Sequence, residues 1–434
     1  MKRIKSLDAL EILDSRGNPT VRVHLKLSDD SVIVASVPSG ASTGQFEAFE
    51  RRDDDPARFN GKGVRGAVAA VREEIAPRII GMNPEEQRQI DRLMCDLDGT
   101  DTKSRLGANA IIGVSMAVAR AAAHARGIPL YKHIASLAGI KTEYFRLPVP
   151  GLNVINGGVH ARNNTIDFQE FMIVPHNAKN FSDSLRWAAQ TYQALKGTLA
   201  ARHLATTVGD EGGFAPNLKT DSQACEFIVE AIKQAGFEPG RDIGIALDPA
   251  ATSFGSNADG YTFKKSTGVH LTRDEMIEFY EGWVDRFPIL SIEDGVADDD
   301  WEGYAAMNRA LGSRIQLVGD DNYVTNVKFI RRGIEEQSTN AVLIKPNQIG
   351  TLTETIEAIA LCHKVGWNTV VSHRSGETED SFIADMAVGC GCSQIKSGAP
   401  CRGERLAKYN RLIEIEHELG DNALFESPFK NQTW

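Results

Sequence analysis

The feature that most constrains the fold is a series of short apolar runs that each end on a charged or polar residue. The runs end at Asp248, Glu293, Asp320, Lys345, His373 and Lys396. From Glu293 onward, successive ends are separated by roughly 23 to 28 residues, the length of one strand, one helix and their loops. This rhythm predicts a parallel β/α barrel. Active sites of β/α barrels lie at the carboxyl ends of the strands, so we expect these side chains to line one site at that end of the barrel, which we call its mouth.

Lys345 illustrates how such a run ends. The apolar residues 341–344 stop at this lysine, and Pro346 follows it. Proline disfavours helical backbone in the residue before it, so we predict that Lys345 is the last extended residue before a loop. Taken alone, a lysine in this position is usually a solvated strand end. The matching ends before and after it favour a functional residue instead.

Composition excludes several classes of protein. With 434 residues, 42% hydrophobic and 24% charged, the chain is typical of a soluble globular protein of more than one domain. The net charge of −10 argues against nucleic acid or an anionic membrane as the main partner. Six cysteines without CxxC spacing predict reduced thiols, and no apolar stretch follows the first residues as in a secretory signal. We therefore expect a cytoplasmic protein.

The first 140 residues have a different pattern. Residues 21–27 alternate apolar and polar side chains and residues 31–37 form a second such run, which predicts antiparallel strands. Helical segments are predicted at 64–80, 84–97 and 108–126. The last is apolar but contains charged residues, which favours a packed amphipathic helix over a membrane span. We predict an α+β capping domain at 1–140, a linker at 147–150 and the barrel at 141–434, an α/β fold overall.

Glycine-rich loops precede or interrupt the barrel. The loop 37–44 could fold over a phosphorylated ligand or place Ser39 on a metal, although composition alone favours a flexible surface turn. The polar loop 156–164 contains His160 and could close over a site, although a lone histidine there is more often structural. Gln169 and Glu170 begin an apolar strand at 168–174, and a strand at 206–208 runs into Glu211, a candidate acid at the same mouth. Outer helices are predicted at 222–235, 272–287, 301–311, 326–336 and 352–365.

The strand ends indicate a particular chemistry. Asp248, Glu293 and Asp320 would form a hard oxygen site suited to Mg²⁺, unless each acid simply pairs with a lysine or arginine. Lys345 and Lys396 would face that metal, and nearby cations with partial desolvation would lower a lysine pKa enough for it to act as a base. The guanidinium of Arg374 can donate two hydrogen bonds to a phosphate or carboxylate, and the hydroxyl of Ser375 can donate another. These groups fit proton abstraction next to a carboxylate.

The chain also resembles the enolase (phosphopyruvate hydratase) family along nearly its whole length. The matching stretches are 11–20, 37–44, 169–172, 209–213, 291–295, 319–321, 345–350 and 372–378. The resemblance implies an enolase-type barrel with an irregular start that includes an antiparallel strand. It implies reversible dehydration of 2-phospho-D-glycerate to phosphoenolpyruvate in glycolysis and gluconeogenesis, with two Mg²⁺ ions per site. It further implies a homodimer or larger homo-oligomer.

The resemblance also implies individual roles. Lys345 would remove the C2 proton, and Glu211, with Glu170 close by, would protonate the departing C3 hydroxyl. Metal ligands would be Asp248, Glu293, Asp320 and, at a second ion, Ser39. Substrate-binding residues would be His160, Gln169, His373, Arg374, Ser375 and Lys396.

Some positions depart from the family pattern. Val159 replaces a more polar residue, the stretch 160–169 is one residue longer than usual, and Thr252 with Ser253 alters the segment after Asp248. Gly403 stands where serine is common. These changes touch a lid and a loop, so a paralogue that performs the same elimination on a related phospho- or phosphono-carboxylate is an alternative to an enolase. A non-catalytic binding or scaffold protein is a third hypothesis, which the intact set of acids and Lys345 disfavours.

Overall fold

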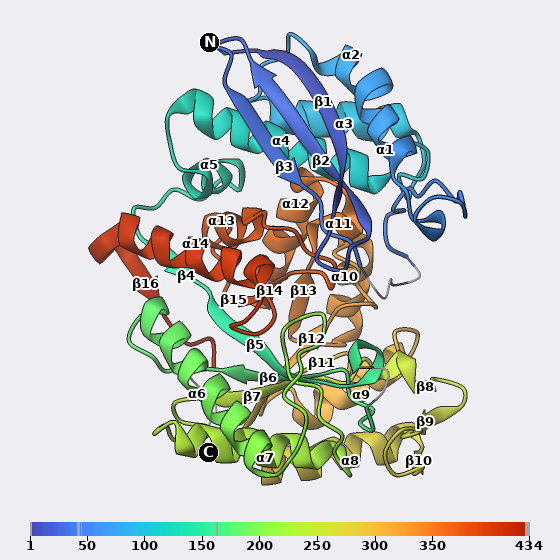
Figure 1. Ribbon diagram of the computed structural model, residues 1–434, viewed down its shortest axis with the longest axis vertical. Helices are drawn as coiled ribbons and strands as arrows, with labels where there is room; N and C mark the ends of the chain where they lie inside the picture. Colours follow the sequence, from blue (N-terminus) through green and yellow to red (C-terminus); the bar gives the residue numbers. More distant parts are fainter. Residues whose placement is uncertain (1, 41–43, 45, 162–163, 430–434) are drawn as a thin grey trace.

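The computed structural model describes residues 2–40, 44, 46–161 and 164–429. Figure 1 shows the amino-terminal strands and helices lying above a barrel. The closed barrel has the strand order β11, β12, β13, β14, β15, β5, β6 and β7. These strands are β5 Val149–Asn156, β6 Glu170–Val174, β7 Gly244–Asp248, β11 Ile289–Glu293, β12 Gln316–Gly319, β13 Ala341–Ile344, β14 Asn368–Ser372 and β15 Gln394–Lys396. The predicted barrel and the positions of its strand ends are therefore confirmed.

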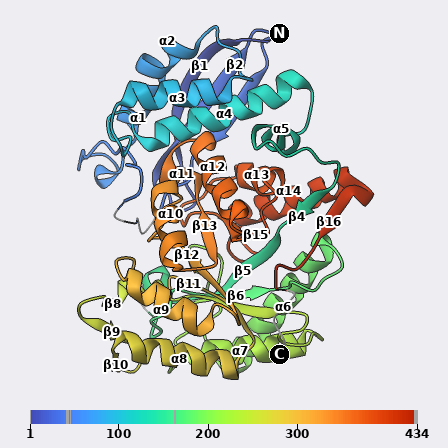
Figure 2. The same ribbon diagram turned by 180° about the vertical axis from the view of Figure 1, so that it is seen from behind.

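The start of the barrel is irregular. β6 pairs antiparallel with both of its neighbours, β5 and β7, whereas the other barrel strands pair in parallel. Helices cover the outside of the barrel, as the views from both sides show (Figures 1 and 2). They are α6 Phe181–Ala201, α7 Asp221–Gln234, α8 Arg273–Arg286, α9 Trp301–Leu311, α10 Val327–Glu336, α12 Leu352–Lys364, α13 Phe382–Gly389 and α14 Gly403–Leu419. A small sheet, β8 Gly255–Ser256, β9 Gly260–Thr262 and β10 His270–Leu271, lies between β7 and α8 in the chain.

The amino-terminal part is an antiparallel sheet packed on helices. Its elements are β1 Ile4–Leu13, β2 Pro19–Leu27, β3 Val32–Ser36, α1 Arg65–Ala69, a π-helical segment Ala70–Ile75, α2 Ala76–Ile79, α3 Gln87–Asp98, α4 Ala108–Arg126 and α5 Leu130–Leu137. α4 was expected to be amphipathic, but it is buried around most of its surface because the sheet, α3, α5 and α11 (Pro346–Ile349) all pack against it. Small residues permit this closeness: a Cβ on Gly113 would lie 2.9 Å from Val23. None of the described helices is long and apolar enough to cross a membrane.

Several local predictions are wrong. The stretch 147–150 is no linker, because Leu147 ends β4 (Phe145–Leu147), which pairs with β16 (Ala423–Phe425), and Val149 begins β5. The strand predicted at 206–208 is also not formed. Only Val208 pairs, in an isolated antiparallel bridge with Phe214, and the chain reverses between them at a turn that includes Gly212, whose φ is +87°. The residues after Lys345 form the short helix α11 rather than a loop. Proline is favourable at the first helical position because no amide donor is needed there.

Buried ion pairing joins α4 to the barrel. The Arg120 guanidinium donates two hydrogen bonds to the Asp380 carboxylate, at 2.6 and 2.7 Å. The same carboxylate accepts a 2.9 Å bond from the Ser36 amide of β3. Burial raises the pKa of Asp380, but Arg120 and the backbone donors outweigh it and hold that pKa below its usual value. Asp380 therefore fastens a sheet strand and a helix of the amino-terminal part to the segment after β14.

We predict that Arg120→Met lowers the free energy of unfolding by about 3 kcal/mol, because it leaves the buried Asp380 carboxylate without its cation. The matched control is Arg88→Met, which removes the exposed pair between Arg88 and Glu357 that joins α3 to α12. That change should cost less than about 1 kcal/mol. Denaturant unfolding of both variants measures the difference, and equal losses would contradict the assigned role of Asp380.

Candidate active site

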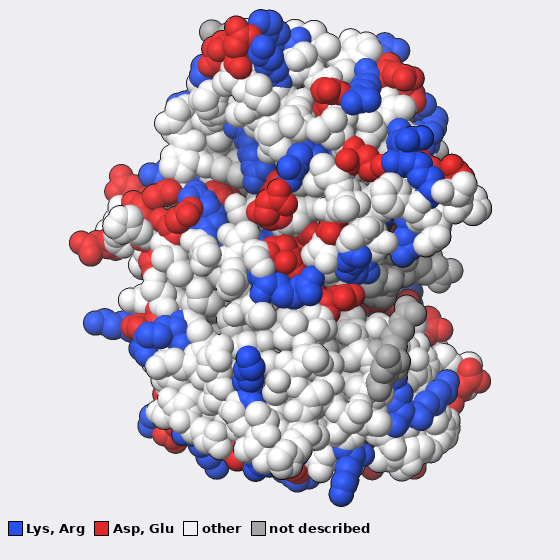
Figure 3. Space-filling view, viewed as in Figure 1, with Lys and Arg blue, Asp and Glu red and all other residues white. Residues whose placement is uncertain are grey.

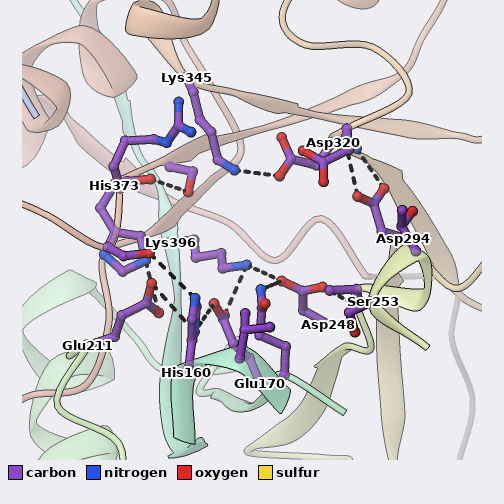
Figure 4. Close-up of a pocket in the computed structure, with 18 of the residues that line it drawn as sticks. His160, Glu170, Glu211, Asp248, Ser253, Asp294, Asp320, Lys345, His373 and Lys396 are labelled. Atoms are coloured by element: carbon purple, nitrogen blue, oxygen red, sulfur yellow. Dashed lines mark hydrogen bonds and ion pairs between the residues drawn. The ribbon is translucent and has the colours of Figure 1, made fainter. Parts of the chain in front are cut away.

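A cavity of about 210 Å³ opens at the carboxyl ends of the barrel strands. Most of the residues predicted from the sequence line it together, and Figure 4 shows their side chains turned toward one another. They are His160, Gln169, Glu170, Glu211, Asp248, Asp320, Lys345, His373, Arg374, Ser375 and Lys396. Glu293 lies just beneath, bonded to Lys396, whereas Ser39 is outside the lining.

Strand direction explains how Glu170 reaches this mouth. It is the first residue of β6, and the antiparallel register pairs it with Asp248, the last residue of β7. Because β6 runs opposite to β7, its beginning lies at the edge where the parallel strands end. The first residue of an antiparallel strand can therefore line the same cavity as the last residues of the parallel strands.

Lys396 gathers the carboxylates at the centre of the cavity. Its ammonium nitrogen lies 3.0 Å from Glu170 Oε2, 3.1 Å from Asp248 Oδ2 and 2.8 Å from Glu293 Oε2. Burial lowers the pKa of Lys396, but the surrounding carboxylates outweigh it and raise that pKa well above its usual value. The acids thus adopt the lysine-paired arrangement that the sequence left as the alternative to a metal site. The all-oxygen set is equally suited to a hard divalent cation.

Lys345 pairs with the carboxylate of Asp320 on the neighbouring strand (Figure 4). The lowering of its pKa was predicted for a site that holds a metal ion, and it stays a prediction. Burial does lower the pKa of Lys345, but Asp320, Asp321 and Glu293 together raise it above the usual value despite the opposing charge of Arg374. A cation bound by the same carboxylates would cancel that attraction.

Glu170, Glu211 and His160 form a tight cluster on the other side of Lys396. His160 Nδ1 lies 3.4 Å from Glu170 Oε1 and 3.8 Å from Glu211 Oε1. Burial and the charge of Glu211 raise the pKa of Glu170 well above its usual value. Burial also acts to raise the pKa of Glu211, but His373 and His160 outweigh it and hold that pKa well below the usual range. The pKa values of the two neighbouring carboxylates are therefore shifted in opposite directions.

The predicted anion clamp is already paired. The Arg374 guanidinium forms a two-pronged contact with Glu47 of the amino-terminal part, at 2.9 and 3.1 Å. Ser375 Oγ lies 3.4 Å from His160 Nε2. Sequence reasoning missed Glu47, because it sits in an irregular segment with no strand or helix pattern to mark it. The Arg374 guanidinium, which was predicted to bind a phosphate or carboxylate, thus binds the carboxylate of Glu47.

Ser39 is buried beside the cavity rather than on it. Its hydroxyl donates to Glu50 at 3.1 Å and accepts from Arg52 at 2.8 Å. Its backbone bridges Gly376, which ties the loop to the segment that carries Arg374 and Ser375. The predicted loop 37–44 includes residues 41–43, which lie outside the described residues.

Comparison with known proteins identifies the family. The model of the enolase N-terminal domain matches residues 4–134, and that of the enolase C-terminal TIM barrel domain matches residues 144–432. Enolase 1 of Methylococcus capsulatus is 56% identical over 98% of this chain and 99% of its own length. Enolase of Desulfotalea psychrophila is 53% identical over 97% of this chain and 99% of its own length. Enolase 2 of Pseudomonas syringae pv. tomato is 53% identical over 98% of this chain and 97% of its own length. The chain belongs to the enolase family.

Three acids missed as site residues line the cavity of this enolase, namely Asp294, Asp298 and Asp321. Asp294 accepts bonds from the amides of Asp320 and Asp321 and from the Tyr304 hydroxyl at 2.8 Å. Burial and the neighbouring Asp320 raise the pKa of Asp294 to about 7. Carboxylate oxygens of Asp294, Asp320 and Asp321 lie within 4.8 Å of one another, a cluster that could hold a metal ion. The sequence could have indicated Asp294 and Asp321, because each directly follows a predicted ligand, Glu293 or Asp320.

The departures from the enolase pattern fall at the rim. Val159, Thr252 and Ser253 all line the cavity, so the altered positions face the ligand space. Of the lengthened stretch, residues 162–163 lie outside the described residues. Gly403 opens α14, and apart from its chain neighbours and the nearby backbone of its own helix, no atom of the described residues lies within 4 Å of the place that a Cβ would take there. Its difference from serine is therefore sterically neutral.

One lysine holds the turn that carries His160. Lys265 donates from its ammonium to the carbonyls of Gly158 at 2.6 Å and Ala161 at 3.2 Å. These carbonyls begin and end the 3₁₀ turn Gly158–Ala161. A charged donor on both ends of a short turn fixes the direction of the side chain between them.

We predict that Lys265→Met lowers kcat/KM about tenfold, equivalent to about 1.4 kcal/mol, because the His160 turn loses both bonds. The matched control is Lys264→Met, its neighbour in the chain, which should change kcat/KM less than about twofold. Steady-state kinetics on the two variants decide the matter. If both behave like the unmodified enzyme, the turn is held by other contacts.

Proposed function

We propose that this cavity catalyses the reversible, Mg²⁺-dependent dehydration of 2-phospho-D-glycerate to phosphoenolpyruvate. The chain is a hydro-lyase of the enolase family, and its match to enolases runs over almost its full length. The observation that carries the assignment is the placement of Lys345 and the Glu170–Glu211 pair on different sides of one acid-lined cavity (Figure 4). An elimination needs a base and an acid that reach the same substrate from separate directions.

The residues fit the divided roles. Lys345 removes the C2 proton, and Glu211 delivers a proton to the departing C3 hydroxyl. Glu170 lies beside Glu211, and His160 Nδ1 is 3.4 Å from Glu170 Oε1 and 3.8 Å from Glu211 Oε1. With the base and the acid on opposite faces of the substrate, the elimination would be anti.

The carboxylates account for the cation requirement. Asp248, Glu293 and Asp320 would hold one Mg²⁺, and Ser39 with the substrate phosphate a second. The carboxylate oxygens fit a hard cation, and Ser39 would first have to leave Glu50 and Arg52. When bound, the cation supplies positive charge next to the substrate carboxylate, where negative charge builds up as the C2 proton leaves.

The remaining polar side chains would bind the substrate. We assign this role to His160, Gln169, His373, Arg374, Ser375 and Lys396, which surround the cavity. Arg374 would exchange Glu47 for a substrate oxygen, and Lys396 would turn from the acids to the substrate once a cation compensates them.

We further propose the assembly and the setting. The protein would form a homodimer or larger homo-oligomer and act in the cytoplasm. Its described cysteines are all free, which suits a reducing compartment. The face drawn in Figure 3 mixes acidic and basic side chains instead of gathering a basic patch, which disfavours nucleic acid as a partner there. The division at residue 140 stays a prediction.

The first test is the ultraviolet absorbance of the enol phosphate. Purified protein mixed with 2-phosphoglycerate and Mg²⁺ should give a rise that a chelator abolishes, since the acids cannot compensate the developing charge alone. A flat trace from folded protein that binds Mg²⁺ would contradict the substrate assignment. Related phospho- and phosphono-carboxylates would then be assayed, with Val159 and Ser253 as the first positions to exchange.

A second test separates the base from the acid. Lys345→Ala should lose both dehydration and solvent exchange of the C2 proton, by about 10³-fold or more, while Mg²⁺ binding is retained. Glu211→Gln should lose dehydration but keep C2 exchange, because only the second step needs its proton. Proton exchange followed by NMR in deuterated solvent distinguishes the variants. Retained exchange in Lys345→Ala would refute its role as the base.

A further inference from the structure

Arg405 is the largest fully buried side chain among the described residues, and it lies directly behind the active site. It sits in the first turn of α14 with no exposed surface. A fully buried guanidinium is costly unless its donors are used. The side chain passes over Gly398, whose φ is +77°, where a Cβ would lie 2.9 Å from Arg405 Cδ. The fold therefore makes room for this arginine at a position that only glycine suits.

Both terminal nitrogens of Arg405 reach the catalytic segments. Its Nη1 lies 2.5 Å from His373 Nδ1 and 2.7 Å from the Arg374 carbonyl. Its Nη2 donates to the carbonyls of Ser375 at 2.6 Å and Asp210 at 3.1 Å. The chain thus uses one cation to clamp the segment 373–375 against the turn that presents Glu211.

The contact with His373 has a chemical consequence. Arginine only donates hydrogen bonds and stays protonated, so His373 Nδ1 has to be the acceptor. A neutral imidazole that accepts at Nδ1 carries its proton on Nε2. His373 Nε2 lies 3.4 Å from Glu211 Oε2, and Figure 4 shows the two residues side by side. The proton would therefore point at the carboxylate that serves as the acid.

We propose that Arg405 is a positioning residue that fixes His373 as the neutral Nε2–H tautomer and so directs a hydrogen bond onto Glu211. The imidazole is almost fully buried, and the charged groups around it are Glu211, Arg405 and Lys396. Glu211 favours a protonated ring, whereas the two cations oppose it. The clamp acts through His373 and touches no substrate atom. Only its kinetic consequence rests on the proposed function.

The tautomer can be read directly by long-range ¹H–¹⁵N NMR of the whole protein labelled with ¹⁵N-histidine. His373 is assigned by the loss of its signals in His373→Gln. Between about pH 6 and 9, wild-type His373 should show an unprotonated Nδ1 and a protonated Nε2. A proton on Nδ1, or a doubly protonated ring, would overturn the proposal whatever the protein turns over.

Variants test the cause. Arg405→Met should abolish the fixed tautomer, so that His373 shows mixed tautomers or titrates within that range, whereas Arg405→Lys retains a cationic donor and should keep Nε2–H. The control is Lys408→Met, which removes another buried cation of α14, bonded to Glu377 and the Thr378 carbonyl. It should leave the His373 signals unchanged. A fixed tautomer in Arg405→Met would contradict the assignment.

Kinetics provide a second measurement. Arg405→Met should lower kcat about 10- to 100-fold while KM changes little, because the lost bond acts on the proton donor and not on substrate contacts. Arg405→Lys should recover part of kcat. If Arg405→Met does not fold, the wild-type spectrum and the lysine variant still decide the proposal. Absence of any enolase activity in the wild type would contradict the proposed function but leave the tautomer result standing.

Discussion

The rest of the site depends on the compensation of buried charge across the mouth of the barrel. β15 and β11 stand on opposite sides of the closed strand order, yet Lys396 at the end of β15 bonds Glu293 at the end of β11. A carboxylate buried without a partner would be protonated or would destabilise the fold. The lysine therefore spans the barrel and lets several acids stay close together. A shorter side chain at this strand end could not reach them.

The antiparallel direction of β6 brings Glu170 to the mouth of the barrel, whereas in a parallel strand its first residue would lie at the opposite end. β6 contributes Glu170 from its first residue, next to the final residue of β7. Burial and the charge of nearby Glu211 raise the pKa of Glu170, whereas His373 and His160 outweigh burial and lower the pKa of Glu211, so the two pKa values move apart. Two carboxylates with opposite shifts are the usual means by which one site both stores and releases a proton near neutral pH.

The sequence predicted the parts that depend on strand periodicity. The ends at Asp248, Glu293 and Lys345 were identifiable because a buried parallel strand is an uninterrupted apolar run, and its end marks the mouth. Pairings between distant segments were not predictable. Arg405 lies on an ordinary helix and Glu47 in an irregular segment, and only the folded chain brings them to His373 and Arg374. The direct contact between Lys345 and Asp320 was not predictable for the same reason, because the sequence does not say which acid the lysine meets.

A common principle connects the cations of the site. Lys345 holds Asp320, Lys396 holds Asp248 and Glu293, and Arg374 holds Glu47. Each of these cations already has an internal partner, so an anion that bound to one of them would exchange one ion pair for another. Under the proposed function, the ion pairs broken when the substrate binds would offset part of the ion pairs that it forms. An enzyme that runs its reaction in both directions benefits from this arrangement, since stabilisation is reserved for the charge that appears only in the transition state.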